Sequence, residues 1–431
     1  MRDKNVPSVQ VENFFRLPFK PETRILTLDT LNDYSDFRRP KKPYLFIETR
    51  KLSFVNEVLT LGIVLDDEEE ELVYIKATAS ELLVSCSVDT EKDYLSRSAY
   101  FALYYLMLFH RQFDFEDFYW PGFFDPETGD CKYLMISKSK GGLAVAPKIR
   151  YKGLYKPGQP LPVVLKDIFT AEEAIPKVQE PIPKERDVVL GFCLADTHPE
   201  RWHSNHYPFL IPYIGILDKK KTFVKGFKSY VLDEQILSEM DFSDEQQRLV
   251  EICFAMKKIA LIQQPEYKED IDLFAEKQEK NKYNFNRLFE LWQEAIPILA
   301  GRLYTHYHFT FGMRNVKGKP SKLNMKPCRF NNEVPKICFL WKEIGDYYKL
   351  ELRLTLGKEI YEVTYFYNTT FFVRTSGDQR NYFLLDSLMD NELISFFQKY
   401  HFQLLILKVH YEGYCEDFIG QLKKNYQFIK R

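Results

Sequence analysis

A proline-rich segment is the feature that most restricts how this chain can fold. Six prolines fall between residues 156 and 186, namely Pro157, Pro160, Pro162, Pro176, Pro181 and Pro183. Proline lacks an amide hydrogen and fixes its own φ, so such a stretch favours irregular backbone over a helix or a central strand. We interpret it as a linker. At 431 residues the chain is long enough for about three domains, so several folded regions are expected.

Strand and helix patterns alternate on both sides of this linker. Apolar and β-branched runs predict strands within 43–88, 132–149, 188–231 and 336–374. Apolar residues spaced three and four apart predict helices near 92–110, 268–279, 284–296 and 385–399. Ser243 and Gln246 form a capping-box pattern that predicts a helix start. The sequence predicts an α+β, multi-domain fold of mixed antiparallel sheets with a central helical segment.

Four regions are expected from these patterns. They are an N-terminal domain at 1–125, a basic hairpin with the linker at 126–186, an α/β domain at 187–300 and a C-terminal α+β domain at 301–431. No apolar run is long enough to cross a membrane and no apolar leader follows Met1, so we expect a cytoplasmic protein. The seven cysteines are scattered, with no C-x-x-C spacing, which suits a reducing compartment.

Two long stretches contain no acidic residue. From 131 to 166 there are eight Lys and Arg residues, and from 295 to 332 there are seven, whereas the whole chain has 60 basic and 61 acidic residues. Segregated charge of this kind favours attraction of a polyanion. The sequence therefore predicts a nucleic-acid surface in each stretch.

Catalytic and metal motifs are not found in the sequence. Gly312 and Gly318-Lys319 resemble a phosphate-binding loop only superficially, because the spacing is wrong and Pro320 stands where Ser or Thr is needed. His198, His203 and His206 cluster without cysteine partners or a known ligand spacing, which favours ordinary histidines over a metal site. We expect no enzyme activity, no cofactor and no metal.

The segment from Glu81 to Met107 is similar to a SWIM zinc finger in its layout of strand, polar turn and helix. Cys86 matches the first ligand of that family, but Val88 takes the second position, and Ser96 and Ser98 are the plausible occupants of the last two. One ligand of four cannot hold zinc. An unrelated strand–turn–helix with a buried cysteine is the alternative interpretation.

From Asp187 onward the chain resembles the non-catalytic N-terminal region of SNF2-type helicases of Bacteroidetes-like bacteria. The resemblance rests on the order of DVVLGFCLAD, YPFLIPYIGIL, FSDEQQRLVEICFAM, NRLFELWQEAIPILAGRL and KICFLWKEIGDYYKLELRLTL, and on the closing block from Asn381 to Tyr426. It implies a bacterial accessory region with an SNF2-type ATPase as partner, in cis or in trans. The helicase motifs themselves are absent, so translocase activity is not implied; a fragment of a longer helicase and a free-standing accessory protein both remain open.

The resulting hypothesis is an accessory region that binds DNA, with RNA as the alternative, and positions or regulates the ATPase. Tyr151 and Tyr155 would stack on bases. The candidate phosphate contacts are Lys138, Lys140, Lys148, Arg150, Lys152, Lys156, Arg314, Lys317, Lys319 and Lys322. The alternative is a protein-interaction scaffold without nucleic-acid binding, for which the aromatic segment 113–124 would have to be exposed. We expect that segment to be buried core instead.

Overall fold

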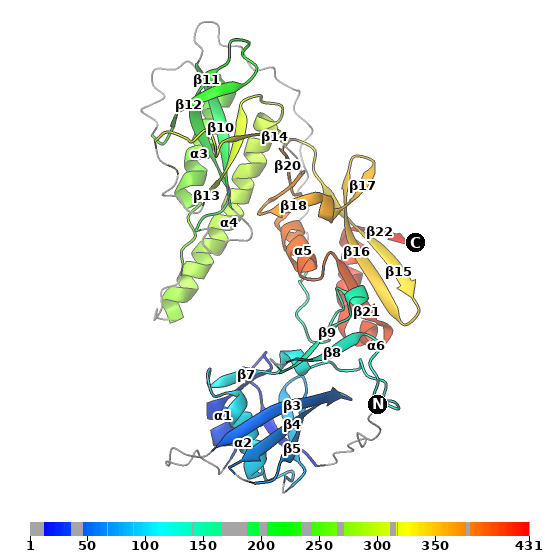
Figure 1. Cartoon of the computed structure of the whole chain (residues 1–431). Helices are drawn as coiled ribbons and strands as arrows, with labels where there is room; N and C mark the ends of the chain where they lie inside the picture. The colour runs from blue at the N-terminus through cyan, green and yellow to red at the C-terminus, as the bar shows by residue number, and fades with distance from the viewer. Residues whose placement is uncertain are drawn as a thin grey trace. The chain divides into compact units, whose positions relative to one another are not determined.

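The computed structural model describes residues 13–35, 46–66, 68–88, 90–139, 142–164, 188–197, 205–233, 243–264, 271–310, 316, 318–375 and 380–430. The chain forms two compact units (Figure 1). The first comprises Met1–Leu161, Gly345–Tyr348 and Leu405–Asp417, and the second comprises Pro162–Ile344, Lys349–Leu404 and Phe418–Arg431. Helices and strands are mixed in both units, which confirms the predicted α+β class.

The first unit is built on a five-stranded antiparallel sheet in the order β1-β6-β5-β4-β3. Its strands are β1 (Phe15–Pro18), β3 (Ile47–Val55), β4 (Val58–Leu65), β5 (Glu71–Ala77) and β6 (Glu81–Cys86). Helix α2 (Arg97–Leu106) packs on this sheet and buries Tyr100, Phe101 and Leu103. Short α1 (Leu28–Asp33) contacts α2, and β2 (Ile25–Thr27) pairs with β7 (Gln112–Asp114).

The basic hairpin belongs to this first unit. Strands β8 (Leu134–Ser139) and β9 (Gly142–Pro147) pair antiparallel, as the sequence predicted. The 3₁₀ helix η1 (Glu116–Phe118) precedes them, and the 3₁₀ helix η2 (Ile149–Tyr151) follows directly. The Leu405 amide donates to the Gly153 carbonyl at 2.8 Å, so a late segment of the chain completes the unit.

The second unit is centred on an eight-stranded sheet in the order β12-β11-β10-β13-β14-β20-β19-β18. Its strands are β10 (Val188–Thr197), β11 (Phe209–Leu217), β12 (Val224–Tyr230), β13 (Thr305–Thr310), β14 (Lys326–Asn331), β18 (Phe366–Thr369), β19 (Phe372–Thr375) and β20 (Arg380–Leu384). Helix α3 (Asp244–Ile259) packs on β11, and α4 (Ile271–Leu299) packs on α3, β14 and β20. Residues before 300 and after 300 thus share one sheet and one core.

A smaller sheet follows in the order β17-β16-β15-β22, with β21 paired to β16. Its strands are β15 (Lys336–Ile344), β16 (Tyr347–Leu356), β17 (Glu359–Glu362), β21 (Gln403–Leu407) and β22 (Gln427–Lys430). The other helices among the described residues are η5 (Val363–Tyr365), α5 (Leu388–Lys399), α6 (Lys408–His410), the π-helical turn η6 (Tyr411–Cys415) and α7 (Glu416–Asn425). In the described residues no helix combines the length and apolar character needed to span a bilayer.

Local patterns predicted most of these elements. The capping box is confirmed: Ser243 Oγ accepts from the Gln246 amide, and the Gln246 side chain accepts from the Ser243 amide. The two helices predicted at 268–279 and 284–296 are a single helix α4 that includes Pro297 in its last turn. Residues 165–186 of the predicted linker lie outside the described residues.

Candidate nucleic-acid interface

The cations of the first acid-free stretch have different surroundings in the hairpin. Lys138 on β8 is exposed, and its Nζ is 3.5 Å from the Leu52 carbonyl oxygen. Lys148 is only half-exposed, because its ammonium group donates to the carbonyls of Cys131 and Lys132 at 3.3 and 2.8 Å. The bonds of Lys148 close the base of the hairpin. We therefore assign it a structural role first and a phosphate contact second.

The residues that follow the hairpin include exposed cations and buried tyrosines. Arg150 on η2 is exposed, with its guanidinium 4.7 Å from the Tyr151 ring centroid, and Lys152 is exposed as well. Tyr151 and Tyr155 are both buried, and Tyr151 belongs to the core of the first unit. The prediction that these tyrosines stack on bases is therefore wrong, since both rings are removed from solvent, with Tyr151 packed against Tyr133.

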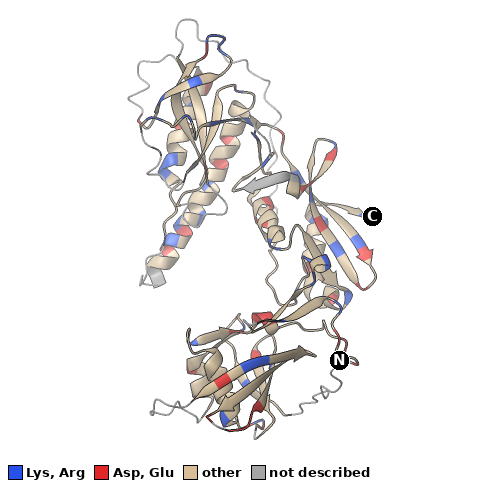
Figure 2. Ribbon diagram, in the orientation of Figure 1, with Lys and Arg blue, Asp and Glu red and all other residues tan. Residues whose placement is uncertain are grey.

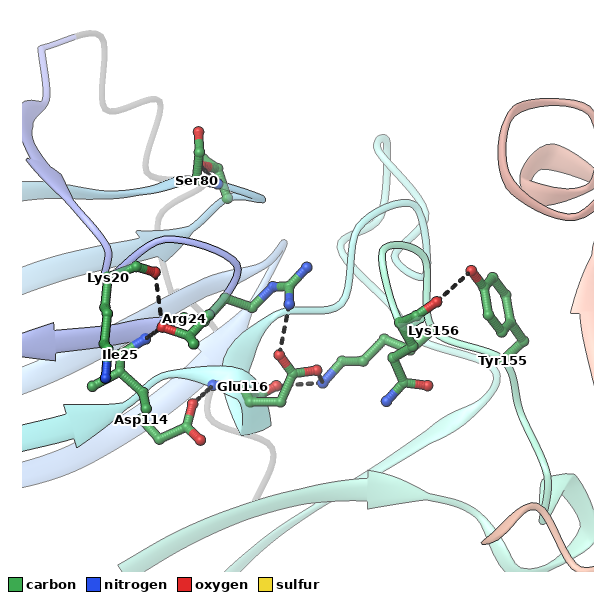
Figure 3. A network of polar contacts seen from close by, with 11 residues as sticks. Lys20, Arg24, Ile25, Ser80, Asp114, Glu116, Tyr155 and Lys156 are labelled. Carbon is green, nitrogen blue, oxygen red and sulfur yellow. Dashed lines mark hydrogen bonds and ion pairs between the residues drawn. The ribbon is translucent and has the colours of Figure 1, made fainter. Parts of the chain in front are cut away.

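Lys156 is the clearest departure from the predicted surface. Its ammonium group forms an ion pair with Glu116 (Figure 3). The side chain is 6% exposed, and its Nζ lies 4.3 Å from the Trp120 ring centroid. Arg24 holds the other carboxylate oxygen of Glu116 at 3.0 Å and lies over Tyr119. Burial lowers the pKa of Lys156, although the nearby Glu116 carboxylate partly offsets that effect. An enclosed, paired ammonium cannot reach a phosphate, so we exclude Lys156 from the surface.

The second acid-free stretch keeps more of its charge in solvent. Arg302 is buried and pairs with Glu245 at 3.0 Å. Lys319, Lys322, Lys326 and Arg329 are exposed, and none forms an ion pair with a described residue. Gly318, just before Lys319, has φ +50°, a left-handed conformation that glycine adopts without strain. Lys140, Arg314 and Lys317 lie outside the described residues.

A third group of lysines lies outside the two stretches that the sequence singled out. Between Asp218 and Asp233 the chain has no acidic residue and five lysines, which are Lys219, Lys220, Lys221, Lys225 and Lys228. They lie on the turn between β11 and β12 and on β12 itself, where Figure 2 shows blue segments. The sequence does contain a signal for this group, namely the acid-free run 219–232, but that run is much shorter than the runs 131–166 and 295–332.

The SWIM-like segment forms the expected strand, turn and helix without a set of metal ligands. Cys86 ends β6 and is half-buried, and Ser96 is the N-cap of α2. Burial raises the pKa of the Cys86 thiol, and the nearby Ser96 hydroxyl partly offsets that effect. Val88 is exposed and Ser98 is buried. Nowhere in the described part of the chain do three His, Cys, Asp or Glu side chains converge as metal ligands would.

Packing accounts for the aromatic segment 113–124 and for the histidines of the second unit. The aromatic segment 113–124 is mostly core, with Phe115, Phe118, Tyr119, Trp120 and Phe123 all buried, as expected. This burial removes the feature on which the scaffold alternative depended. His306 is also buried, and its Nδ1 lies 2.8 Å from the Tyr213 hydroxyl. Of the histidines near 200, His206 is buried against Phe209, and His198 and His203 fall outside the described residues.

Comparison with known proteins found no matching family model, no matching curated protein and no matching solved structure. A functional proposal for this chain therefore depends on the chemistry of the side chains described above.

Proposed function

We propose that this chain is a non-catalytic nucleic-acid-binding protein that acts as an accessory region of an SNF2-type ATPase. The observation that carries the binding proposal is the set of exposed cations in 316–329. Lys319, Lys322, Lys326 and Arg329 reach solvent within 11 residues that contain no carboxylate. A patch of this kind binds the phosphate backbone of a nucleic acid, because each phosphate that a lysine or arginine neutralises releases condensed counterions.

The first unit offers a second, smaller group of exposed cations. Lys138, Arg150 and Lys152 lie on the β8–β9 hairpin and on the residues after it. Contacts from these cations to the phosphate backbone would position the chain without selecting a sequence. DNA is the preferred ligand in this proposal, and RNA is the alternative. Binding to a bacterial chromosome would take place in the cytoplasm.

The association with an SNF2-type ATPase rests on the resemblance of residues 187–426 and on nothing in the geometry. It is testable by adding the purified chain to an SNF2-type ATPase core from the same genome. The proposal expects the DNA-stimulated rate of ATP hydrolysis to change with the concentration of the chain. An unchanged rate, together with no co-sedimentation, would remove the ATPase partner from the proposal.

The binding proposal is tested by charge reversal in the second unit. The K319E/K322E variant should bind a short DNA duplex more weakly than the wild type, and its log–log salt slope should be shallower by about 0.9 for each phosphate that the variant no longer neutralises. K280E/K282E is the matched control, since both lysines are exposed on α4 in the same unit. Equal effects of the two double substitutions would show that only net charge matters and would contradict the proposed site.

A further inference from the structure

The turn between β11 and β12 is held in one conformation by a single carboxylate. Asp218 accepts hydrogen bonds from the amides of Lys220, Thr222 and Phe223 at 3.0, 2.7 and 3.1 Å. The Tyr304 hydroxyl also donates to the Lys221 carbonyl at 2.8 Å. The only acidic side chain at this turn is thus engaged by the backbone. A turn ordered in this way loses little conformational freedom when it binds a ligand.

Strand β12 contains two β-bulges, and each bulge displaces a lysine from the ladder. In the register with β11, Ser229 pairs with Ile214 and Phe227 with Gly215, so Lys228 has no partner. Gly226 pairs with Ile216 and Val224 with Leu217, so Lys225 has none either. Bulges redirect side chains that a regular strand would send alternately to either face.

The bulges change the burial pattern of β12 from the usual period of two to a period of three. Val224, Phe227 and Tyr230 are all buried, while Lys225 and Lys228 are both exposed. The strand can therefore keep three apolar anchors in the core and still present two ammonium groups to solvent. The Tyr230 amide donates to the Gly318 carbonyl at 2.7 Å, which brings the end of β12 against the residue before Lys319.

An exposed aromatic ring accompanies these lysines. Phe223 lies between the three lysines of the turn and Lys225, and 58% of its surface is accessible to solvent. A single exposed aromatic ring is ordinary on a protein surface, but this ring lies among lysines, and rings and cations together are the combination that binds single-stranded nucleic acid. Bases of a duplex are stacked on one another, so a protruding ring can stack only on an unpaired base.

From this arrangement we infer that the β11–β12 hairpin is a contact site for single-stranded nucleic acid. Phe223 stacks on one base, and Lys225 and Lys228 contact the phosphates on either side of the path along β12. The inference rests on the proposed nucleic-acid binding and adds to it the strand type and a site outside the predicted stretches. The ligand is recognised by its charge and its exposed bases, without a sequence preference.

Protection of a sheet edge is the competing explanation of the same residues. Lysines and bulges on an edge strand prevent another strand from pairing with it, and β12 is the edge of the eight-stranded sheet. Phe223 does not fit that explanation, because an exposed aromatic ring makes an edge more adhesive. The lysines of the turn also lie beyond the paired residues, where they protect no ladder.

The experiment compares oligo-dT of about 15 nucleotides with a duplex of the same length, using fluorescence anisotropy of the full chain. F223A should weaken binding to oligo-dT by about 5- to 150-fold, the equivalent of one stacked base, and should change duplex binding by less than about 2-fold. Y283A is the matched control, since Tyr283 is 69% exposed on α4. K225E/K228E should weaken oligo-dT binding more than K280E/K282E does.

The outcomes separate this inference from the proposed function. A wild-type chain that binds neither oligonucleotide at low salt would overturn both. A wild-type chain that binds, with F223A indistinguishable from Y283A, would overturn the hairpin site alone. Unchanged affinity of K225E/K228E, together with aggregation of K225V/K228V, in which the edge has lost both charges, would assign these lysines to edge protection and would overturn the inference as well.

Discussion

The buried ion pair of the first unit gives a prediction that follows directly from its geometry. Glu116 pairs with Arg24 through one oxygen and with Lys156 through the other (Figure 3). The Lys156 side chain is only 6% exposed. Replacing Glu116 by Gln leaves two cations facing each other with no carboxylate between them. Removing one partner of a fully buried pair costs about 3–5 kcal/mol. Because the Glu116 side chain is 32% exposed, solvent screens part of this, and we expect about 2 kcal/mol for E116Q.

Substitution of Lys156, the other member of the ion pair, should lower the free energy of unfolding by less than E116Q does. K156M leaves the Arg24–Glu116 pair intact and places an apolar side chain on Trp120, so its cost should be about 1 kcal/mol. A matched surface control is E68Q, since the Arg97–Glu68 pair is 43% and 52% exposed and should contribute less than about 1 kcal/mol.

The pH dependence of E116Q has a defined sign. Desolvation lowers the pKa of Lys156 in the folded state below its value in the unfolded chain, and Glu116 opposes that shift. Without Glu116 the pKa falls further, so the protonated form of the variant is destabilised at neutral pH. Part of the lost stability should return as the pH rises toward the ordinary lysine pKa, where the unfolded chain also releases the proton.

Hydrogen exchange of the full chain measures these differences in each unit separately. Amides of β4 and β5 report on the first unit, and amides of β10 and β11 serve as an internal reference in the second. E116Q should lower the opening free energy of β4 and β5 only. The reasoning is refuted if K156M costs as much as E116Q, or if E116Q is as mild as E68Q.

Two further predictions concern stability. Burial lowers the pKa of His306 to about 4, so its contribution to the stability of the second unit should be present above about pH 6.5 and should fall by about 2 kcal/mol by pH 5, as the unfolded chain takes up the proton. Burial also lowers the pKa of His206 and His308, so H306Q should reduce the pH dependence of urea unfolding without abolishing it. A wild-type chain equally stable at both pH values would contradict this prediction. Gly122 has φ +73°, and an added Cβ would lie 2.8 Å from His410 Nε2. G122A should therefore destabilise the first unit by about 1–3 kcal/mol in the same assay. The control is G420A, which has open space around it in α7 and should not destabilise that helix.

Much of the fold was predictable because its signals are local. The capping box at Ser243, the antiparallel hairpin at 134–147 and the strands on either side of Asp66 all follow from neighbouring residues. The eight-stranded sheet was not predictable in the same way, since β10 pairs with β13 more than 100 residues later. Pairing over such a distance leaves no trace in periodicity.

The exposure of the candidate cations was also not predictable from local sequence. A run of cations without acids is visible in the sequence, but its exposure depends on partners far along the chain. The sequence around Lys156 predicts an exposed residue, but in the structure its ammonium group contacts Glu116 and Trp120 and is buried. Lys132 forms an ion pair with Asp346 at 2.7 Å. The bulge lysines of β12 were hidden for a different reason. A period of three matches neither the strand pattern nor the helix pattern, so no template identifies it.

The affinity of the full chain for nucleic acid as a function of salt tests the central claim most directly. Anisotropy titrations with oligo-dT and with a duplex, at about 50 and about 200 mM salt, provide the measurement. The account predicts binding at the lower salt concentration, a decrease of at least about tenfold at the higher one, and a further decrease in K319E/K322E. Absence of binding at about 50 mM, or an affinity that does not depend on salt, would contradict it.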